Sequence, residues 1–192
     1  MIKYTYIILL VICFSCNEDY KPKPKAQLRL DFPETNYVTT NLDLPFTFDK
    51  NLIAEKIKIK PLKSTTKSYG LNLEYPALKG TIFITYKAIE NNQQNLKDYL
   101  KDAQKFTLEH TQKADEIPAY PYEDSSRKVY GLLSEVKGDV ASPAQFYVTD
   151  SINHFITGSV YFYAKPNYDS IYPAAQYLQN DVKRLMESLQ WK

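Results

Sequence analysis

The sequence predicts an α+β domain in which an antiparallel sheet has one helix layer on each face, an α/β/α sandwich. Many segments alternate apolar and polar residues with the period of a strand, and the 17 tyrosines favour half-buried strands. Two segments instead carry apolar residues at helical spacing, around 96–106 and 171–189. The expected strands Lys79–Ala88 and His154–Ala164 are apolar on both faces. Both faces of the sheet therefore need cover.

The N-terminus predicts a lipoprotein signal peptide over residues 1–15. Lys3 is followed by an apolar run, Tyr6–Phe14, and then by Ser15 and Cys16. This run is shorter than the roughly 20 residues that a transmembrane helix needs. A cysteine directly after a small residue looks like a bacterial lipobox. In such proteins the thiol is joined to diacylglycerol, the peptide is cut before the cysteine, and the new amino group is acylated, for example with palmitate. We expect lipidation at Cys16, and a soluble secreted protein with a free cysteine is the alternative.

A short tether is expected between the anchor and the domain. Asn17, Glu18 and Asp19 form an acidic cluster that resembles a surface-export signal, or else a solvated linker. The alternation of lysine and proline in Lys21–Lys25 predicts an extended polyproline II path. We therefore assign residues 16–25 to the lipidated cysteine and its tether, and 26–192 to a single α+β domain.

Composition excludes several classes of function. A net charge of +2 gives no electrostatic case for nucleic acid. Both cysteines lie in the signal region and only two histidines are present, so we expect no disulfide, metal site or cofactor. The sequence has no G-x-S-x-G elbow, phosphate-binding glycine loop or H-E-x-x-H motif. We expect a protein that is not an enzyme, and a deep pocket with paired, perturbed carboxylates would argue otherwise.

The first half of the domain predicts strands. Alternation indicates short strands at Ala26–Phe32, around Phe46 and Phe48, at 56–60, at 71–75 and at Lys79–Ala88. The third of these has Lys56, Lys58 and Lys60 on one face. Such a lysine row protects a sheet edge, or it fits an acidic partner surface.

The second half predicts a helix, a meander and a final helix. The first helix is expected from an N-cap at Asn95 to about Lys113. Ile117–Asp124 is a tyrosine- and proline-rich loop that either contacts a partner or folds onto the sheet. Three strands with tight turns follow, and the last helix has one apolar stripe. The strands are Lys128–Val136, Ala144–Thr149 and His154–Ala164, and the stripe is Ile171, Ala175, Leu178, Val182, Leu185, Met186 and Leu189.

The best candidate interaction surface is the junction between the last strand and the last helix. It combines tyrosines, which anchor many interfaces, with charged and polar residues. The alternative is that these tyrosines pack the corner, and exposure would favour the partner hypothesis. A glycan- or small-ligand-binding domain is a further alternative, with aromatic faces in a concave site. The candidate residues are Tyr161, Tyr163, Lys165, Pro166, Asn167, Tyr168 and Asp169.

The chain resembles known proteins in two respects. The order of elements resembles the PsbP-like fold. The segments K-P-K-P-K-A-Q-L-R-L-D-F-P, S-P-A-Q-F-Y-V-T-D-S and G-S-V-Y-F-Y-A-K-P-N-Y-D-S-I-Y-P-A-A, with Trp191 near the end, resemble GldD, a family of gliding motility lipoproteins from Bacteroidota. This resemblance implies an envelope lipoprotein, anchored in the outer membrane, that is required for gliding. It also implies partners in the gliding and type IX secretion machinery, and it supplies no catalytic residues.

Overall fold

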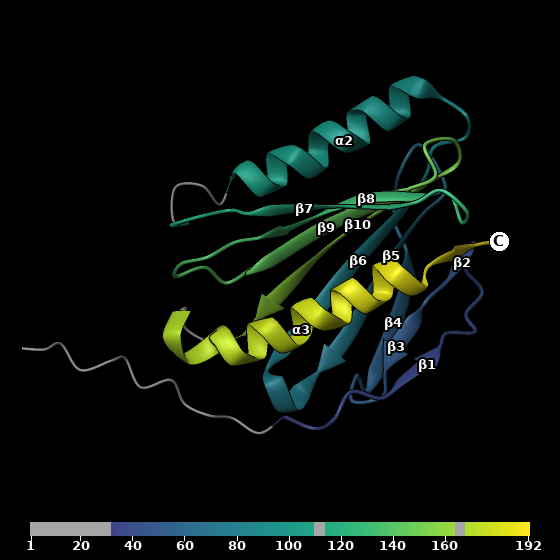
Figure 1. Ribbon diagram of the computed structural model, residues 1–192. Helices are drawn as coiled ribbons and strands as arrows, with labels where there is room; N and C mark the ends of the chain where they lie inside the picture. Colours follow the sequence, from purple (N-terminus) through teal and green to yellow (C-terminus); the bar gives the residue numbers. More distant parts are fainter. Residues whose placement is uncertain (1–31, 110–113, 164–167) are drawn as a thin grey trace, which may run out of the picture.

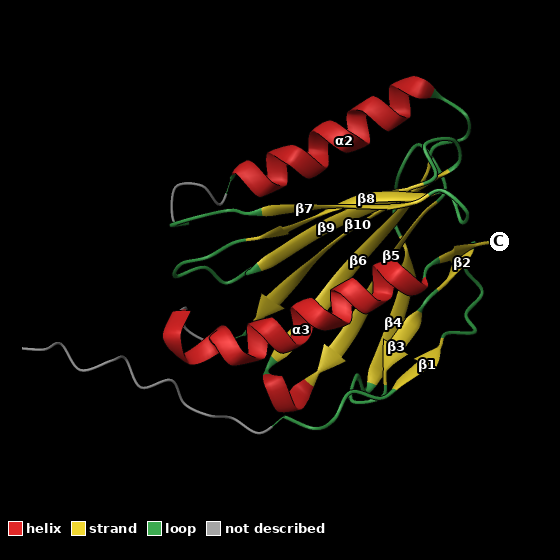
Figure 2. Ribbon diagram, in the orientation of Figure 1, coloured by secondary structure: helices red, strands yellow, loops and turns green. Residues whose placement is uncertain are grey.

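The computed structural model describes residues 32–109, 114–163 and 168–192, and every structural statement below concerns these residues. They form a mixed α+β fold with one large antiparallel sheet and two long helices (Figure 2). The predicted signal peptide, Cys16, the acidic cluster of Asn17, Glu18 and Asp19, and the tether lie outside the described residues. So does the segment from Lys165 to Asn167.

The main sheet has seven strands in the order β4-β5-β6-β10-β9-β8-β7, and all neighbours are antiparallel. The predicted meander is confirmed, since β8, β9 and β10 are adjacent. Two small sheets pair β1 with β3 and β2 with β11. The bounds are β1 Tyr37–Thr39, β2 Phe46–Thr47, β3 Asp49–Asn51, β4 Lys56–Pro61, β5 Ser68–Tyr75, β6 Gly80–Ala88, β7 Ala119–Asp124, β8 Val129–Glu135, β9 Ala144–Thr149, β10 His154–Phe162 and β11 Gln190–Trp191.

The two helices lie on opposite faces of this sheet, α2 (Gln93–Leu108) above it and α3 (Tyr168–Ser188) below it in Figure 1. Strand alternation separates two cores. On β10, Phe155 packs with Tyr99 of α2, whereas the next residue, Ile156, belongs to the core under α3. A short 3-10 turn, η2 (Pro76–Leu78), joins β5 to β6.

The core under α3 is the larger one. The predicted apolar stripe of α3 is buried along its whole length, from Ile171 to Leu189. Leu178 packs closely against Gly80 of β6. A Cβ atom added to Gly80 would lie only 2.8 Å from Cδ1 of Leu178. Pro173 lies inside α3. Large side chains from the sheet and from β2 complete this core, among them Phe46, Leu71, Leu73, Tyr75, Ile82 and Ile156.

The start of α2 differs from the prediction. The N-cap is Asn92, whose Oδ1 accepts a hydrogen bond from the Gln94 N–H at 2.9 Å. Asn95 is already inside the first turn, and its side-chain Nδ2 donates to the Ile89 carbonyl at 3.0 Å. Both asparagines can cap a helix, and the left-handed backbone of Glu90 and Asn91 selects the earlier one.

The Ile117–Asp124 segment is largely a strand rather than a loop. Residues 119–124 form β7, which pairs with β8 at the edge of the sheet, so the alternative of folding onto the sheet holds. The loop prediction was wrong because proline, here Pro121, is rare inside sheets. An edge strand tolerates it, since one side of that strand has no ladder to complete.

The two small sheets were not predicted. β1, β3 and β11 are two or three residues long, and the partner of β11 is far away in sequence. Gln190 and Trp191, for example, pair with Thr47 and Phe46. A hydropathy pattern cannot extend over so few residues, so this pairing left no local signal.

In the described ranges, no helix is both long and apolar enough to cross a membrane.

Candidate functional site: the α2-facing side of the sheet

The α2-facing side of the sheet is only partly covered. In α2 itself, whose residues are all described, Tyr99 is the one buried residue. Its ring packs 5.7 Å from Phe155, and its hydroxyl is 2.8 Å from Thr66 Oγ1. Leu96, Leu100 and Ala103 are partly buried around it. The helix is thus attached mainly through the N-terminal half of its length.

Beyond α2, three aromatic side chains lie on this side of the sheet. Phe83 of β6 is 6.3 Å from Tyr161 of β10, measured between ring centroids, and Tyr161 is 5.2 Å from Tyr163 in an edge-to-face arrangement. Tyr161 is 38% exposed and Tyr163 63% exposed. The backbone N–H of Tyr163 donates to the Lys79 carbonyl at 2.9 Å, which fixes its position beside β6. We call Phe83, Tyr161 and Tyr163 the aromatic cluster.

The predicted interaction segment is therefore only partly placed. Tyr161 and Tyr163 are exposed and do not pack a closed corner. Tyr168 and Asp169 begin α3, and Lys165, Pro166 and Asn167 lie outside the described residues. Phe83 was missed, although its place on a central strand opposite Ser159 makes it a neighbour of Tyr161.

Lysines extend the same side of the sheet to its β4 edge. Lys56, Lys58 and Lys60 are all exposed, as the alternation predicted. Lys58 is paired with Glu74 of the neighbouring strand, with its Nζ 2.5 Å from Oε1. Ile57, one residue along, packs against the core on the other side. The open part of this face thus combines cations at one edge with aromatic rings near its centre.

Two grooves flank the C-terminal half of α2. The first, which we call the outer groove, has a volume of about 340 Å³ and lies between α2 and strands β7, β8 and β9. The second, the inner groove, has a volume of about 290 Å³ and lies between α2 and strands β6 and β10. Phe106 lines both. Tyr99, the buried residue of α2, lies in the N-terminal half of the helix. The C-terminal half buries no residue against the sheet, which leaves the two grooves beside it.

Among the described residues, the carboxyl groups whose pKa values are shifted lie elsewhere, toward α3. Burial raises the pKa of Asp181, although its carboxylate accepts hydrogen bonds from Tyr37 at 2.7 Å and from Asn51 at 3.0 Å. Burial beside this carboxylate also raises the pKa of Tyr75. These contacts join β1, β3 and β5 to α3. The Asp181 carboxylate is thus surrounded by hydrogen-bond donors, and these contacts hold the small β1–β3 sheet against α3. This role is structural.

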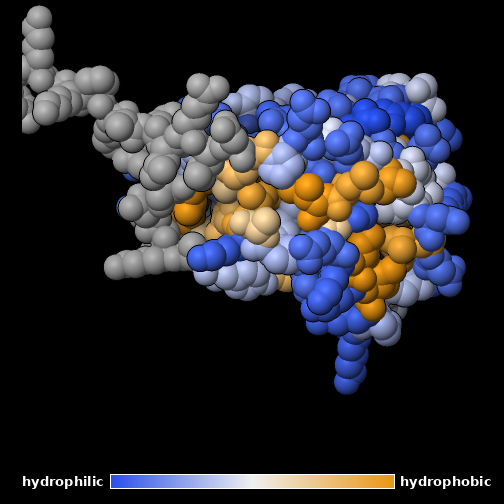
Figure 3. Space-filling view, turned by 90° about the horizontal axis from the view of Figure 1, so that it is seen from below, coloured by the Kyte–Doolittle hydropathy of each residue, from blue (hydrophilic) through white to orange (hydrophobic). Residues whose placement is uncertain are grey.

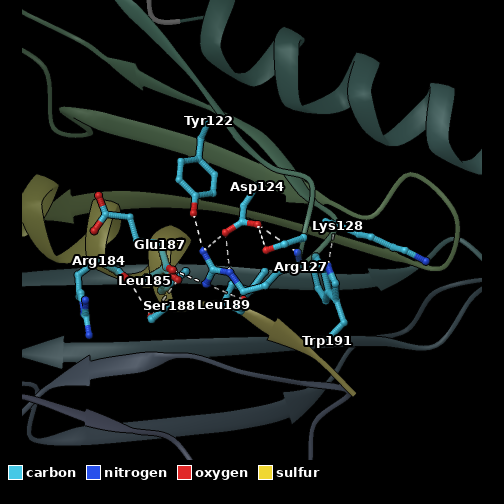
Figure 4. Close-up of polar contacts among 11 residues, drawn as sticks. Tyr122, Asp124, Arg127, Lys128, Arg184, Leu185, Glu187, Ser188, Leu189 and Trp191 are labelled. Carbon is cyan, nitrogen blue, oxygen red and sulfur yellow. Dashed lines mark hydrogen bonds and ion pairs between the residues drawn. The ribbon is translucent and has the colours of Figure 1, made fainter.

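A second polar cluster closes the end of α3 (Figure 4). Arg127, in the turn between β7 and β8, donates to the carbonyls of Glu187 and Leu189. Its Nε donates to Asp124 Oδ2 at 2.8 Å and its Nη2 to the Tyr122 hydroxyl at 2.8 Å. Hydrogen bonds from Ser126 and Arg127 hold the pKa of Asp124 well below its usual range. Arg127 thus satisfies carbonyls that a helix C-terminus leaves without partners.

His154 packs near the C-terminus of the chain, close to the end of α3. The His154 ring stacks on Trp191, with centroids 5.0 Å apart, and its Nδ1 is 2.9 Å from the Tyr86 hydroxyl. Burial lowers the pKa of His154 and raises that of Tyr86 to about 12.

In the part of the chain that the structure describes, no group of three His, Cys, Asp or Glu side chains could hold a metal ion.

The underside of the molecule carries patches of apolar residues. Figure 3 views it from the side of α3 and the small sheets, and apolar residues form patches separated by hydrophilic ones. Val38 and Leu52 are the exposed apolar residues of the β1–β3 region. Single exposed apolar residues of this kind are normal on a protein surface.

Comparison with known families decides the identity of the chain. The family model for the gliding motility lipoprotein GldD matches residues 17–191. The chain belongs to the GldD family. No curated protein matches it. Membership implies involvement in gliding motility and a lipid-anchored position in the cell envelope, and the description of GldD names no enzyme activity. The matched span begins directly after Cys16, the predicted lipidation site.

Proposed function

We propose that this GldD protein is a non-catalytic component of the gliding and type IX secretion machinery that docks on other envelope proteins through the open part of its sheet. One observation carries the proposal: Tyr161 and Tyr163 are exposed beside the half-buried Phe83 at the surface of a seven-stranded sheet. Tyrosines on a rigid frame supply large contact area at low cost in conformational entropy, and they are frequent hot spots.

The neighbouring charges support a partner with acidic groups. Lys56, Lys58 and Lys60 lie at the β4 edge of the same sheet, and Glu74 pairs with Lys58 among them. Complementary charge around an aromatic anchor speeds association and selects partners. The lysines also discourage pairing of β4 with a foreign strand, so docking would use the face of the sheet.

The test is gliding by cells that carry the double variant Tyr161→Ser/Tyr163→Ser as their only copy. We expect gliding to be lost while the amount of protein and its thermal midpoint stay close to those of the wild type. Tyr120→Ser is the matched control, since Tyr120 is an exposed tyrosine on β7, at the far edge of the sheet. Normal gliding of the double variant would refute the proposal.

We further propose that Cys16 is the lipid anchor and that the protein lies in the outer membrane of a member of the Bacteroidota. The lipobox-like sequence and the start of the family match at residue 17 support this. Several acyl chains hold a protein on a membrane durably, whereas a single chain binds weakly. Cys16→Ala should leave the domain folded and move it out of the membrane fraction. A variant that stays there and supports gliding would rule out this anchor.

The face of the membrane is tested by protease digestion of intact cells, with a periplasmic protein as control. Digestion of the domain would make Asn17, Glu18 and Asp19 an export signal and point to surface partners. Protection would make them a linker and leave the domain in the periplasm.

We also propose that residues 26–192 are one domain with a PsbP-like α/β/α sandwich fold. The order of the elements and the positions of α2 and α3 on opposite faces support this proposal.

A glycan- or small-ligand-binding role is the second candidate function. The inner groove favours it, because Phe83 lies there beside the hydroxyl side chains of Thr85 and Ser159. Aromatic faces with nearby hydroxyl groups suit a sugar ring. Binding of envelope glycan fragments to the wild type, lost in Phe83→Ser and kept in Tyr163→Ser, would favour this role over protein docking.

A further inference from the structure

The outer groove is distinct from the aromatic cluster and has its own chemistry. It lies under the C-terminal half of α2, over strands β7, β8 and β9, and its volume is about 340 Å³. This is within the range of sites that bind small molecules or short segments, roughly 300–1,000 Å³. Its lining is mostly apolar, with Ala103 and Leu108 from α2, Ile117 before β7, and Leu132 and Tyr147 from the sheet.

One polar side chain in this lining has no partner. Gln145 of β9 is 3% exposed, and neither its amide nitrogen nor its amide oxygen has a hydrogen-bond partner among the described residues. Its neighbours contrast with it. Thr157, on the adjacent strand and in the same groove, donates to the Phe146 carbonyl at 3.2 Å. Gln179, a buried glutamine of α3, donates to the Pro143 carbonyl at 3.3 Å.

An unpaired buried amide is costly for the folded protein. Leaving a buried donor or acceptor without a partner costs about 1–3 kcal/mol, and native proteins rarely do so without a reason. A leucine at position 145 would fit an apolar groove without this cost. The glutamine therefore indicates that the working state of the groove contains a group that pairs with it.

The geometry of a carboxamide limits the chemistry of that group. Gln145 offers a donor, Nε2, and an acceptor, Oε1, side by side in one plane. In an extended peptide, the N–H and the carbonyl of one residue point to the same side and supply the complementary pair. A fatty acyl chain supplies neither, and a carboxylate supplies acceptors only. The apolar walls in turn favour apolar residues before and after that residue.

We propose that the outer groove binds an extended apolar peptide segment of another envelope protein, with the main-chain N–H and carbonyl of one residue of that segment paired to Gln145. That the partner is an envelope protein rests on the proposed function. The peptide chemistry rests on Gln145 and the apolar groove alone. Edge pairing is a poor alternative route for such a segment, because Pro121 removes a backbone donor from β7. The peptide would lie on the face of the sheet, against α2.

Binding is measured with the full-length mature protein in phospholipid nanodiscs, with empty discs as the blank, because detergent tails would compete for an apolar groove. The probe is an acetylated peptide of alternating leucine and valine with a lysine at its C-terminal end for solubility. Versions in which one amide at a time is replaced by an ester keep the shape and lose one N–H. Decanoate tests for a lipid occupant.

We expect the all-amide peptide to bind, and one ester position to weaken binding about 5- to 10-fold, the effect of one net hydrogen bond. Gln145→Leu should remove this sensitivity to the ester. The same variant without peptide should be as stable as the wild type or more stable, since it removes an unpaired amide. Gln179→Leu, the matched control, should lose stability and keep the sensitivity to the ester.

Three results would overturn the inference: no binding of any peptide, equal binding of every ester and amide, or an unchanged ester pattern in Gln145→Leu. Tighter binding of decanoate than of the peptides would reassign the groove to lipid. Failure here is separable from failure of the proposed function, because gliding of the Tyr161→Ser/Tyr163→Ser variant tests the aromatic cluster alone.

Discussion

The two helices cover the two faces of one sheet in different ways. On the α3 side, the apolar stripe from Ile171 to Leu189 is buried, and large side chains of β2, β5, β6 and β10 meet it. On the α2 side, Tyr99 is the one buried helix residue, and grooves lie on both sides of the second half of the helix. The same sheet thus has one closed face and one partly open face.

The residues that stabilise the fold and the candidate contact residues lie on different faces of the sheet. The polar clusters of Asp181 and Arg127 both join other elements to α3. The aromatic cluster, the lysine row and Gln145 all lie on the α2 side. Side chains that are free of core packing can meet a partner without loss of the fold. We therefore assign stability to the α3 side and contacts to the α2 side.

The largest expected effect comes from the closed face. Leu178→Ala should lower the free energy of unfolding by about 3 kcal/mol or more, because it leaves a cavity in a fully buried site over Gly80. Leu100→Ala in the partly buried face of α2 should cost only about 1 kcal/mol. Urea denaturation followed by the fluorescence of the single tryptophan measures both. Equal losses would erase the contrast between the helices.

The Arg127 cluster is the next test. Arg127→Ala removes charged donors from the carbonyls at the end of α3 and should cost about 2 kcal/mol. Arg184→Ala is the matched control, because Arg184 is an arginine of α3 itself. Its ion pair with Asp49 is at the surface, so its loss should cost less than about 1 kcal/mol. A larger loss of stability in Arg184→Ala than in Arg127→Ala would contradict the structural role of the Arg127 cluster.

Attachment of α2 is tested by Tyr99→Phe. The variant keeps the ring over Phe155 and removes the hydroxyl that meets Thr66 Oγ1 at 2.8 Å. The expected loss of stability is about 1 kcal/mol, the net value of one buried hydrogen bond. Amide exchange of α2 should speed up more than that of α3, since α2 has few other buried contacts. Equal acceleration in both helices would mean that α2 does not open on its own.

The smallest expected effect concerns pH. Burial lowers the pKa of His154 below its ordinary value of 6.5, against a weaker opposing influence of Asp150. The unfolded chain then binds the proton first, so the contribution of His154 to stability is complete above pH 6.5 and declines as pH falls toward the lowered pKa. His154→Gln should show a shallower fall in thermal midpoint between about pH 7 and pH 5. Parallel curves would contradict this assignment.

Long patterned segments could be predicted from the sequence, and short or exceptional ones could not. The apolar stripe of α3, the alternation of β4 and the runs of apolar and β-branched residues in β6 and β10 extend over many residues, so they indicated their elements correctly. The predicted start of α2 was wrong because Asn92 and Asn95 offer the same capping chemistry. The strand β7 was missed because Pro121 is tolerated only at a sheet edge, which a sequence does not reveal.

The candidate site was predictable only in part. Tyr161 and Tyr163 stood out by residue type, and their exposure agrees with the reasoning that favoured a partner. Phe83 and Gln145 did not stand out, because each acquires its meaning from a neighbour on another strand or from α2. A polar residue at an alternating position of a strand otherwise rich in apolar residues, as in Ala144–Thr149, is the signal that could have indicated Gln145.

We propose that partner contacts are made on the α2 side, whereas the α3 side stabilises the fold. A photo-crosslinking amino acid at position 163 or at position 52 tests it in gliding cells, since Tyr163 and Leu52 are 63% and 58% exposed on the two different sides. We predict a discrete crosslink to an envelope protein from position 163 and none from position 52. Crosslinks from position 52 alone would contradict the claim.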